Sequence, residues 1–150
     1  MLLVSLIGLL LVSLTAITHY EALRLISSVL PRLKMPPRPR LLVVISAVFA
    51  AHLFEIWLYA LGYYLVSQDF GLGVLGEFGG TIGSTFSGYL YFSTVTYTSL
   101  GLGDVYPMGD LRLIAGLESL SGLLMIGWSA SFTYLAMERF WDTHTKPRGK

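Results

Sequence analysis

Three long apolar segments constrain the fold of this 150-residue chain more than any other feature. They cover residues 2–18, 41–66 and 111–137. A helix needs about 20 mainly apolar residues to cross a bilayer, so the second and third segments are long enough and the first lies near the lower limit. Charged residues make up only 13% of the chain, against roughly 25% in soluble domains. We therefore predict an all-α membrane protein with three transmembrane helices.

The first apolar segment admits a second interpretation, a cleaved signal peptide. No Lys or Arg precedes it and no clear cleavage site follows it, so we favour a transmembrane helix. Residues 19–33 are more polar and carry apolar residues at helical spacing, which predicts an amphipathic continuation or a helix at the membrane interface. Four prolines among residues 31–39 predict a linker, and its basic residues favour a cytoplasmic location over a binding patch for anionic lipid.

A polar stretch, residues 93–104, separates the second apolar segment from the third. Its hydroxyl side chains lead to Gly101, Gly103 and Asp104. Non-helical backbone at membrane depth occurs only where protein buries it or where it lines a water-filled cavity. The two glycines tolerate backbone angles that other residues avoid, so a short loop can point successive carbonyls in one direction. Carbonyls from several copies of such a loop can replace the water around a monovalent cation.

The residues just before this stretch predict a helix that enters the membrane without crossing it. Ser84 or Thr85 can cap its amino end, and the helix ends near Tyr97. It is apolar enough to enter the bilayer but too short to span it. Together with the glycine-containing loop it predicts a re-entrant hairpin, in which the chain returns to water at Asp104.

Residues 96–104 read T-Y-T-S-L-G-L-G-D and resemble the signature of potassium channels, T-x-T-T-V-G-Y-G-D. Residues 113–122 read L-I-A-G-L-E-S-L-S-G and resemble the start of the inner helix in small bacterial members of that family. The resemblance extends over residues 41–140. It implies a pore domain made of an outer helix, a re-entrant pore helix with a selectivity-filter loop, and an inner helix, assembled as a homotetramer.

The resemblance divides the chain into three parts. An extra N-terminal transmembrane helix and a basic amphipathic linker occupy residues 1–40, the ion-channel pore domain occupies residues 41–141, and residues 142–150 form a short cytoplasmic tail. The implied function is a cation channel that conducts K⁺, with no enzymatic activity and no cofactor besides the permeant ion.

The resemblance also implies roles for individual residues. The filter residues are Ser99, Leu100, Gly101, Leu102 and Gly103, with potassium bound at the first four. Asp104 lies at the pore mouth, and Phe92 and Glu118 support the filter from behind. The candidates for opening and closing the pore are Gly122 as a hinge and Phe132 or Leu135 as a constriction. Ser129 is a further candidate to face the ion path, and contact with lipid or with another helix is the alternative for Ser129, Phe132 and Leu135. Gly116 is expected to pack closely against another helix.

Three filter residues depart from the family's pattern. Ser99 stands in place of Thr, Leu100 in place of Val, and Leu102 in place of Tyr. The family's tyrosine hydroxyl braces the filter, whereas Leu102 can only pack on Phe92. The sequence therefore leaves two alternatives open, a weakly selective channel that passes both Na⁺ and K⁺ and a non-conducting accessory subunit.

His52 and Glu55 lie three residues apart, on one face of the second apolar segment. Ionisable groups at membrane depth usually face protein or water. We favour a pair that braces one helix against another, with a proton-sensitive element as the alternative. A metal site would need a third ligand, for which the sequence offers no obvious candidate. The G-x-G-x-x-G at residues 71–76 follows a membrane span rather than a strand, so we interpret it as part of an external loop.

The charges predict how the chain lies in the membrane. Residues 67–110 contain four acidic residues and no Lys or Arg, whereas the linker and the tail hold most of the basic residues. Short basic segments stay in the cytoplasm, so the amino terminus and the filter loop are expected outside, in a cell-membrane protein. The expected partners are three further copies of the chain, membrane lipids and monovalent cations, with no nucleic acid.

Overall fold

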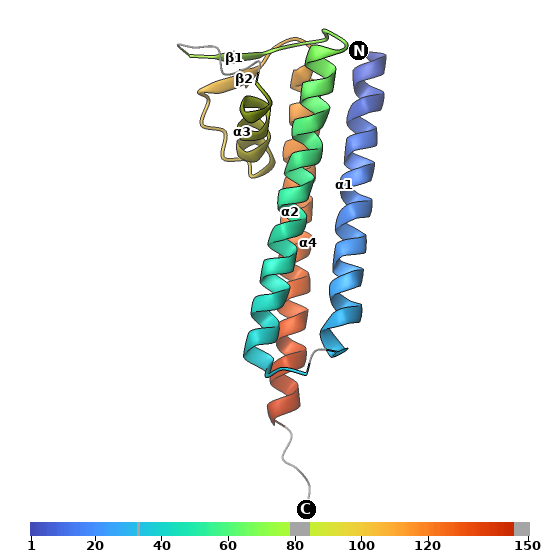
Figure 1. The fold of residues 1–150 in the computed structure, drawn as a ribbon, viewed down its shortest axis with the longest axis vertical. Helices are drawn as coiled ribbons and strands as arrows, with labels where there is room; N and C mark the ends of the chain where they lie inside the picture. Colours follow the sequence, from blue (N-terminus) through green and yellow to red (C-terminus); the bar gives the residue numbers. More distant parts are fainter. Residues whose placement is uncertain (33, 79–84, 146–150) are drawn as a thin grey trace, which may run out of the picture.

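Three long helices form the body of the computed structural model, which describes residues 1–32, 34–78 and 85–145 (Figure 1). They are α1 (Leu2–Val29), α2 (Pro37–Gln68) and α4 (Leu111–Thr145). All three are long and apolar enough to cross a membrane. At 1.5 Å per residue, even α1 measures about 42 Å, which exceeds the hydrocarbon core of about 30 Å. The chain is therefore an all-α integral membrane protein, as predicted.

The boundaries of the first two helices differ from the sequence-based expectation. Residues 19–29 continue α1 without a break, and a single 3₁₀ turn, η1 (Leu30–Arg32), ends it. The second helix begins at Pro37 rather than at residue 41. Proline is tolerated in the first turn of a helix because the N–H that it lacks would have no partner there. The proline-rich linker is thus shorter than predicted.

Close contacts at glycine hold α1 against the rest of the body. A Cβ atom at Gly8 would lie 2.6 Å from Cδ1 of Leu117 on α4. A Cβ atom at Gly62 of α2 would lie 2.7 Å from Cδ1 of Leu11 on α1. Small residues let membrane helices approach one another closely. The extra N-terminal helix therefore packs on both α2 and α4, on the side away from the short helix α3 in Figure 1.

Two short strands fix the path of the chain on either side of α3 (Phe86–Tyr97). Strand β1 (Leu75–Glu77) pairs antiparallel with β2 (Val105–Pro107), with Gly76 opposite Tyr106. Because β1 precedes α3 and β2 follows the filter loop, the chain enters and leaves at the same end of the molecule. This arrangement confirms the predicted re-entrant hairpin, although the strands themselves were not predicted.

The core beneath α3 is mainly aromatic. Its fully or almost fully buried rings belong to Tyr59, Tyr63, Tyr89, Phe92 and Tyr97. A second apolar cluster joins α1, α2 and α4 at the other end of the bundle. Most other apolar side chains of the three spans are exposed on one chain, as expected where helices face lipid or further copies. Ser84, part of the glycine-rich loop and the basic residues of the tail lie outside the described residues.

Candidate functional site

The pore helix α3 is fixed at both of its ends. Thr85 caps the amino end, since its side-chain oxygen accepts a hydrogen bond of 3.3 Å from the Gly88 amide. With 12 residues the helix measures about 18 Å, which confirms that it is too short to cross the membrane. At its carboxyl end the chain turns directly into the predicted filter loop, so the helix sets the position of that loop.

The backbone of the filter loop folds back onto the end of α3. The amides of Leu100 and Gly101 both donate to the carbonyl of Val95, at 2.9 and 3.1 Å. The φ angle is positive at Ser99, Gly101 and Gly103, with values of 57°, 52° and 80°, and it is not positive at the leucines between them. The amides of Leu100 and Gly101 thus face α3, and the sign of φ alternates along the loop. This combination allows successive carbonyls to point away from α3.

All five predicted filter residues are exposed on a single chain. Leu100 is 63% exposed and Leu102 is 62% exposed, although both are apolar. Phe92 is buried and packs edge-on against Tyr63, with ring centroids 5.2 Å apart. The leucine at the family's tyrosine position therefore projects outward, and Phe92 supports the back of α3. One chain leaves the loop uncovered, as required if other copies complete the site.

Hydroxyl groups tie the loop to its surroundings at both ends. At the inner end, Ser99 Oγ lies 2.9 Å from Ser119 Oγ on α4. At the outer end, the Tyr91 hydroxyl donates to Asp104 Oδ2 at 2.7 Å, and the Val105 amide donates to Oδ1 at 3.0 Å. The hydrogen bond from Tyr91 is the main cause that holds the pKa of Asp104 below its ordinary value. Asp104 is therefore a carboxylate at neutral pH, exposed beside the loop.

Glu118 lies behind α3, as predicted, and hydroxyl groups satisfy it. Its carboxyl group is completely buried on α4. Oε1 lies 2.5 Å from Ser93 Oγ of α3, and Oε2 accepts a hydrogen bond from the Tyr63 hydroxyl of α2. Ser93 Oγ also donates to the Ile56 carbonyl at 2.8 Å. One acidic side chain thus joins the pore helix to both neighbouring spans.

The close packing of a glycine in α4 is found at a different position from the one predicted. A Cβ atom at Gly122 would lie only 2.0 Å from the carbonyl oxygen of Tyr97, the last residue of α3. A Cβ atom at Gly116 would meet nothing within 4 Å among the residues that the structure describes. The close packing predicted for Gly116 is therefore found at Gly122, within a helix that continues unbroken from Leu111 to Thr145.

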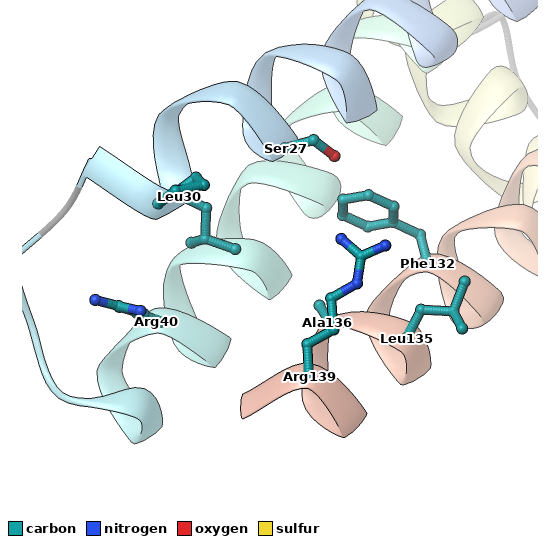
Figure 2. A pocket seen from close by; sticks show the side chains of 8 residues that line it. Ser27, Leu30, Arg40, Phe132, Leu135, Ala136 and Arg139 are labelled. Carbon is teal, nitrogen blue, oxygen red and sulfur yellow. The ribbon is translucent and has the colours of Figure 1, made fainter. Parts of the chain in front are cut away.

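The predictions for two residues of the ion path are wrong. Ser129 is 5% exposed and its hydroxyl lies among histidines of α1 and α2. Phe132 packs against the apolar cluster shared by α1, α2 and α4. Phe132 and Leu135 both line a cavity of about 290 Å³ between the same three helices, near Arg40 and Arg139 (Figure 2). The face of α4 that carries Ser129 and Phe132 therefore meets helices of the same chain, whereas Leu135 remains 51% exposed.

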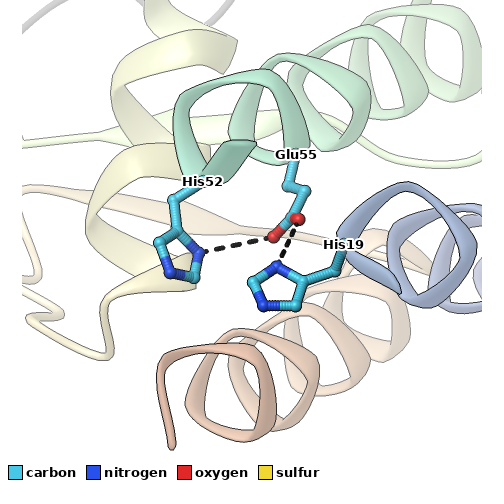
Figure 3. A group of neighbouring side chains, drawn as sticks. All are labelled: His19, His52 and Glu55. Atoms are coloured by element: carbon cyan, nitrogen blue, oxygen red, sulfur yellow. Dashed lines mark hydrogen bonds and ion pairs between the residues drawn. The ribbon is translucent and has the colours of Figure 1, made fainter. Parts of the chain in front are cut away.

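A second polar group, which we call the histidine cluster, lies inside the bundle beside the end of α3. It contains one residue of α1, two of α2, one of α3 and one of α4: His19, His52, Glu55, Tyr97 and Ser129. His19 and Glu55 are completely buried, and the side chain of His52 is 15% exposed. Figure 3 shows both imidazole rings turned toward the carboxylate.

His52 and Glu55 brace α2 against other helices, as predicted, and they do so as part of this larger cluster. His19 Nδ1 lies 2.8 Å from Glu55 Oε1, and His52 Nδ1 lies 3.4 Å from Oε2. The sequence reasoning missed His19 and Tyr97. A histidine within an apolar helix is an ionisable group at membrane depth, and that signal could have drawn attention to His19.

The spans, the re-entrant helix and the exposed loop together define a membrane protein of the pore-loop class. Residues 41–139 match the family of ion channels, and the chain belongs to that family. The matching region runs from the first turns of α2 almost to the end of α4, so α1 lies outside it. No curated protein and no solved structure matches the chain.

Proposed function

We propose that four copies of this chain form a cation channel that conducts K⁺ through a ring of backbone carbonyls. The observation that carries the proposal is the geometry of residues 99–103, where amides bond back to α3 and φ is positive at every second residue. The carbonyls of Ser99, Leu100, Gly101 and Leu102 would then replace water around a dehydrated ion. One loop cannot encircle an ion, and closed cyclic symmetry supplies the ring.

The lining of the path below the filter follows from the contact between Ser99 and Ser119. Positions 4, 7 and 11 residues after Ser119 share its helix face. These are Leu123, Ile126 and Ala130, and all three are exposed on one chain. We infer that this face, rather than that of Phe132, lines the ion path, with Tyr134 one turn further on as the new candidate for a constriction.

The orientation in the membrane is part of the same proposal. The filter end carries Asp69, Glu77, Asp104 and Asp110, and the amino terminus lies at that end, with its ammonium group 3.1 Å from Asp110 Oδ2. Arg40 and Arg139 lie at the other end. The acidic end would face outward in the cell membrane and concentrate cations at the mouth, with the basic end in the cytoplasm.

The second candidate function is a channel with weak selectivity between K⁺ and Na⁺. The observation that favours it is the outward projection of Leu102, a side chain without the hydroxyl that would brace the filter. A loop that lacks this brace adapts to a smaller ion more easily. The activity in either case is passive transport.

Ion flux and reversal potentials in reconstituted vesicles test the two candidates. We expect K⁺ flux and a reversal potential close to that of K⁺, with still higher selectivity in Leu102→Tyr and Ser99→Thr. Gly101→Val is the blocked control, because a β-branched residue does not tolerate the φ of 52° at this position. Equal permeation of Na⁺ and K⁺ would establish the weakly selective channel. Flux no higher than in empty vesicles would leave only the accessory subunit.

The hydrogen bond from Tyr91 predicts how the channel responds to acid. We expect Tyr91→Phe to raise the pKa of Asp104 toward its ordinary value, because the mutation removes the donor that stabilises the carboxylate. Asp104 would then lose its charge at a higher pH as the outer solution is acidified, and K⁺ flux would fall at that higher pH. The measurement is flux against external pH. In an Asp104→Asn background, Tyr91→Phe should leave the pH of half-maximal flux unchanged. A shift of that pH would contradict the assignment of the acid response to Asp104.

A further inference from the structure

The histidine cluster contains more hydrogen-bond contacts than its neutral groups can supply with hydrogens. Two contacts join His19 Nδ1 to Glu55 and Tyr97 Oη to Glu55. A third joins His52 Nδ1 to Tyr97 Oη at 2.9 Å. The last two join the Nε2 atoms of His52 and His19 to the single Oγ of Ser129, at 3.0 and 3.1 Å. Two neutral imidazoles, one phenol and one serine offer four hydrogens for these five contacts.

The missing hydrogen marks a place for one additional cation. An ionised Glu55 carries a negative charge, whereas the neutral imidazole, phenol and hydroxyl groups around it carry none. An unpaired charge buried at this depth is costly, so the cluster is stabilised by a positive partner. Either an extra proton, on one imidazole or on Glu55, or a metal ion between the ligands fills this role.

We propose that the cluster is a binding site for a divalent transition-metal ion of the Zn²⁺ type, held by His19, His52 and Glu55. Each of the three offers a ligand atom, and these atoms all lie within 4.8 Å of one another. Zn²⁺ with bonds of about 2.0–2.1 Å places tetrahedral ligands about 3.3 Å apart. The Nδ1 atoms of His19 and His52 lie 2.8 and 3.4 Å from the oxygens of Glu55, so these two separations need only small adjustments.

The hydrogen bonds of the cluster support the metal through the second nitrogen of each ring. When both Nδ1 atoms bind the ion, both Nε2–H groups donate to Ser129 Oγ, which can accept two hydrogen bonds. Tyr97 still donates to Glu55. Each of the three remaining contacts then has a hydrogen of its own, which is the condition that the metal-free cluster with an ionised Glu55 fails to meet.

The donor set also selects the kind of ion. Two imidazole nitrogens and one carboxylate suit Zn²⁺ and similar transition metals, whereas Ca²⁺, Mg²⁺ and the permeant ions prefer oxygen ligands. The partly exposed side chain of His52 provides the entry path, since the other two ligands are completely buried. A bound ion would join α1 to α2 directly beside the end of the pore helix. The proposal does not depend on conduction.

The test is metal binding by the purified full-length chain after treatment with a chelator. We expect one Zn²⁺ per chain, and a rise in melting temperature of at least about 5 °C once Zn²⁺ reaches 100 times its Kd. Co²⁺ in the same site should give the visible absorption of tetrahedral coordination, a readout that does not depend on stability. Ser129→Ala should weaken binding by about 10-fold, since it removes only the supporting hydrogen bonds.

The variants His19→Gln and His52→Gln identify the ligands. Each keeps a side-chain amide that can donate a hydrogen bond, which helps the chain to fold, and we expect each to weaken Zn²⁺ binding by at least about 100-fold. The matched control is His144→Ala, which changes the third histidine of the chain and should leave affinity unchanged. Equal Zn²⁺ affinity in the glutamine variants, or no binding by the parent chain, would overturn the proposal. In the second case the cluster holds an extra proton.

Discussion

We expect Gly122→Ala to abolish K⁺ flux and to destabilise the assembled protein by about 3 kcal/mol or more, at the upper end of the range for overpacking. The added Cβ would lie 2.0 Å from the carbonyl oxygen of Tyr97, where ordinary van der Waals contact begins near 3.4 Å. The position of the Cβ is fixed by the backbone of α4, and the Tyr97 oxygen belongs to the backbone of α3, so no side-chain rotation can relieve the clash. The end of α3 must move away from α4, and the filter loop moves with it.

Gly127→Ala is the matched control for this prediction. It makes the same chemical change on the same helix, but its Cβ would meet nothing within 4 Å in the described part of the chain. Alanine favours a helix over glycine by about 1 kcal/mol, so the control should be neutral or slightly stabilising. Thermal unfolding and vesicle flux should be measured on both variants. If Gly122→Ala conducts like the control, the contact between α3 and α4 does not determine the position of the filter.

The spans and the re-entrant helix could be predicted because each has a local signal. The spans follow from apolar length, and the start of α3 follows from Thr85 in the capping position. The position of Glu118 behind the pore helix was implied by the resemblance of residues 113–122 to the inner helix of the channel family. These features depend on few residues outside their own segment.

The rotation of each span about its axis could not be predicted. Ser129 and Phe132 were assigned to the ion path, yet they lie on the face of α4 that meets α1 and α2. A helix that is apolar on all sides gives no amphipathic signal to indicate which face is buried. The same limit explains why Gly116 was chosen for close packing instead of Gly122.

The histidine cluster could not be predicted because its members come from all four helices. His52 and Glu55 share one helix face and were recognised as a pair, but His19 lies 36 positions before Glu55 and belongs to a helix outside the matched family region. Strands β1 and β2 could not be predicted for a similar reason. With three residues each they are too short for a periodic pattern, and their pairing across the hairpin creates them.

A count of hydrogens around Glu118 indicates that its carboxyl group carries a proton. Ser93 has one hydroxyl hydrogen, which it can donate to the Ile56 carbonyl at 2.8 Å. The contact of 2.5 Å between Ser93 Oγ and Glu118 Oε1 then needs a second hydrogen, and a protonated carboxyl group supplies it. The Tyr63 hydroxyl donates to the other oxygen. A neutral carboxyl group also avoids an unpaired charge in a completely buried position.

We therefore expect Glu118→Gln to fold and conduct like the parent, because its amide can donate to Ser93 and accept from Tyr63. Glu118→Ala should lower the free energy of unfolding by about 3–5 kcal/mol, since it leaves the buried Tyr63 hydroxyl without its partner, removes the contact with Ser93 and opens a cavity. Denaturant unfolding measures both variants, with Glu138→Ala on an exposed part of the same helix as the control. If Gln is as damaging as Ala, the group is ionised in the folded protein, because an amide imitates only the protonated acid. The filter would then be supported by a charge.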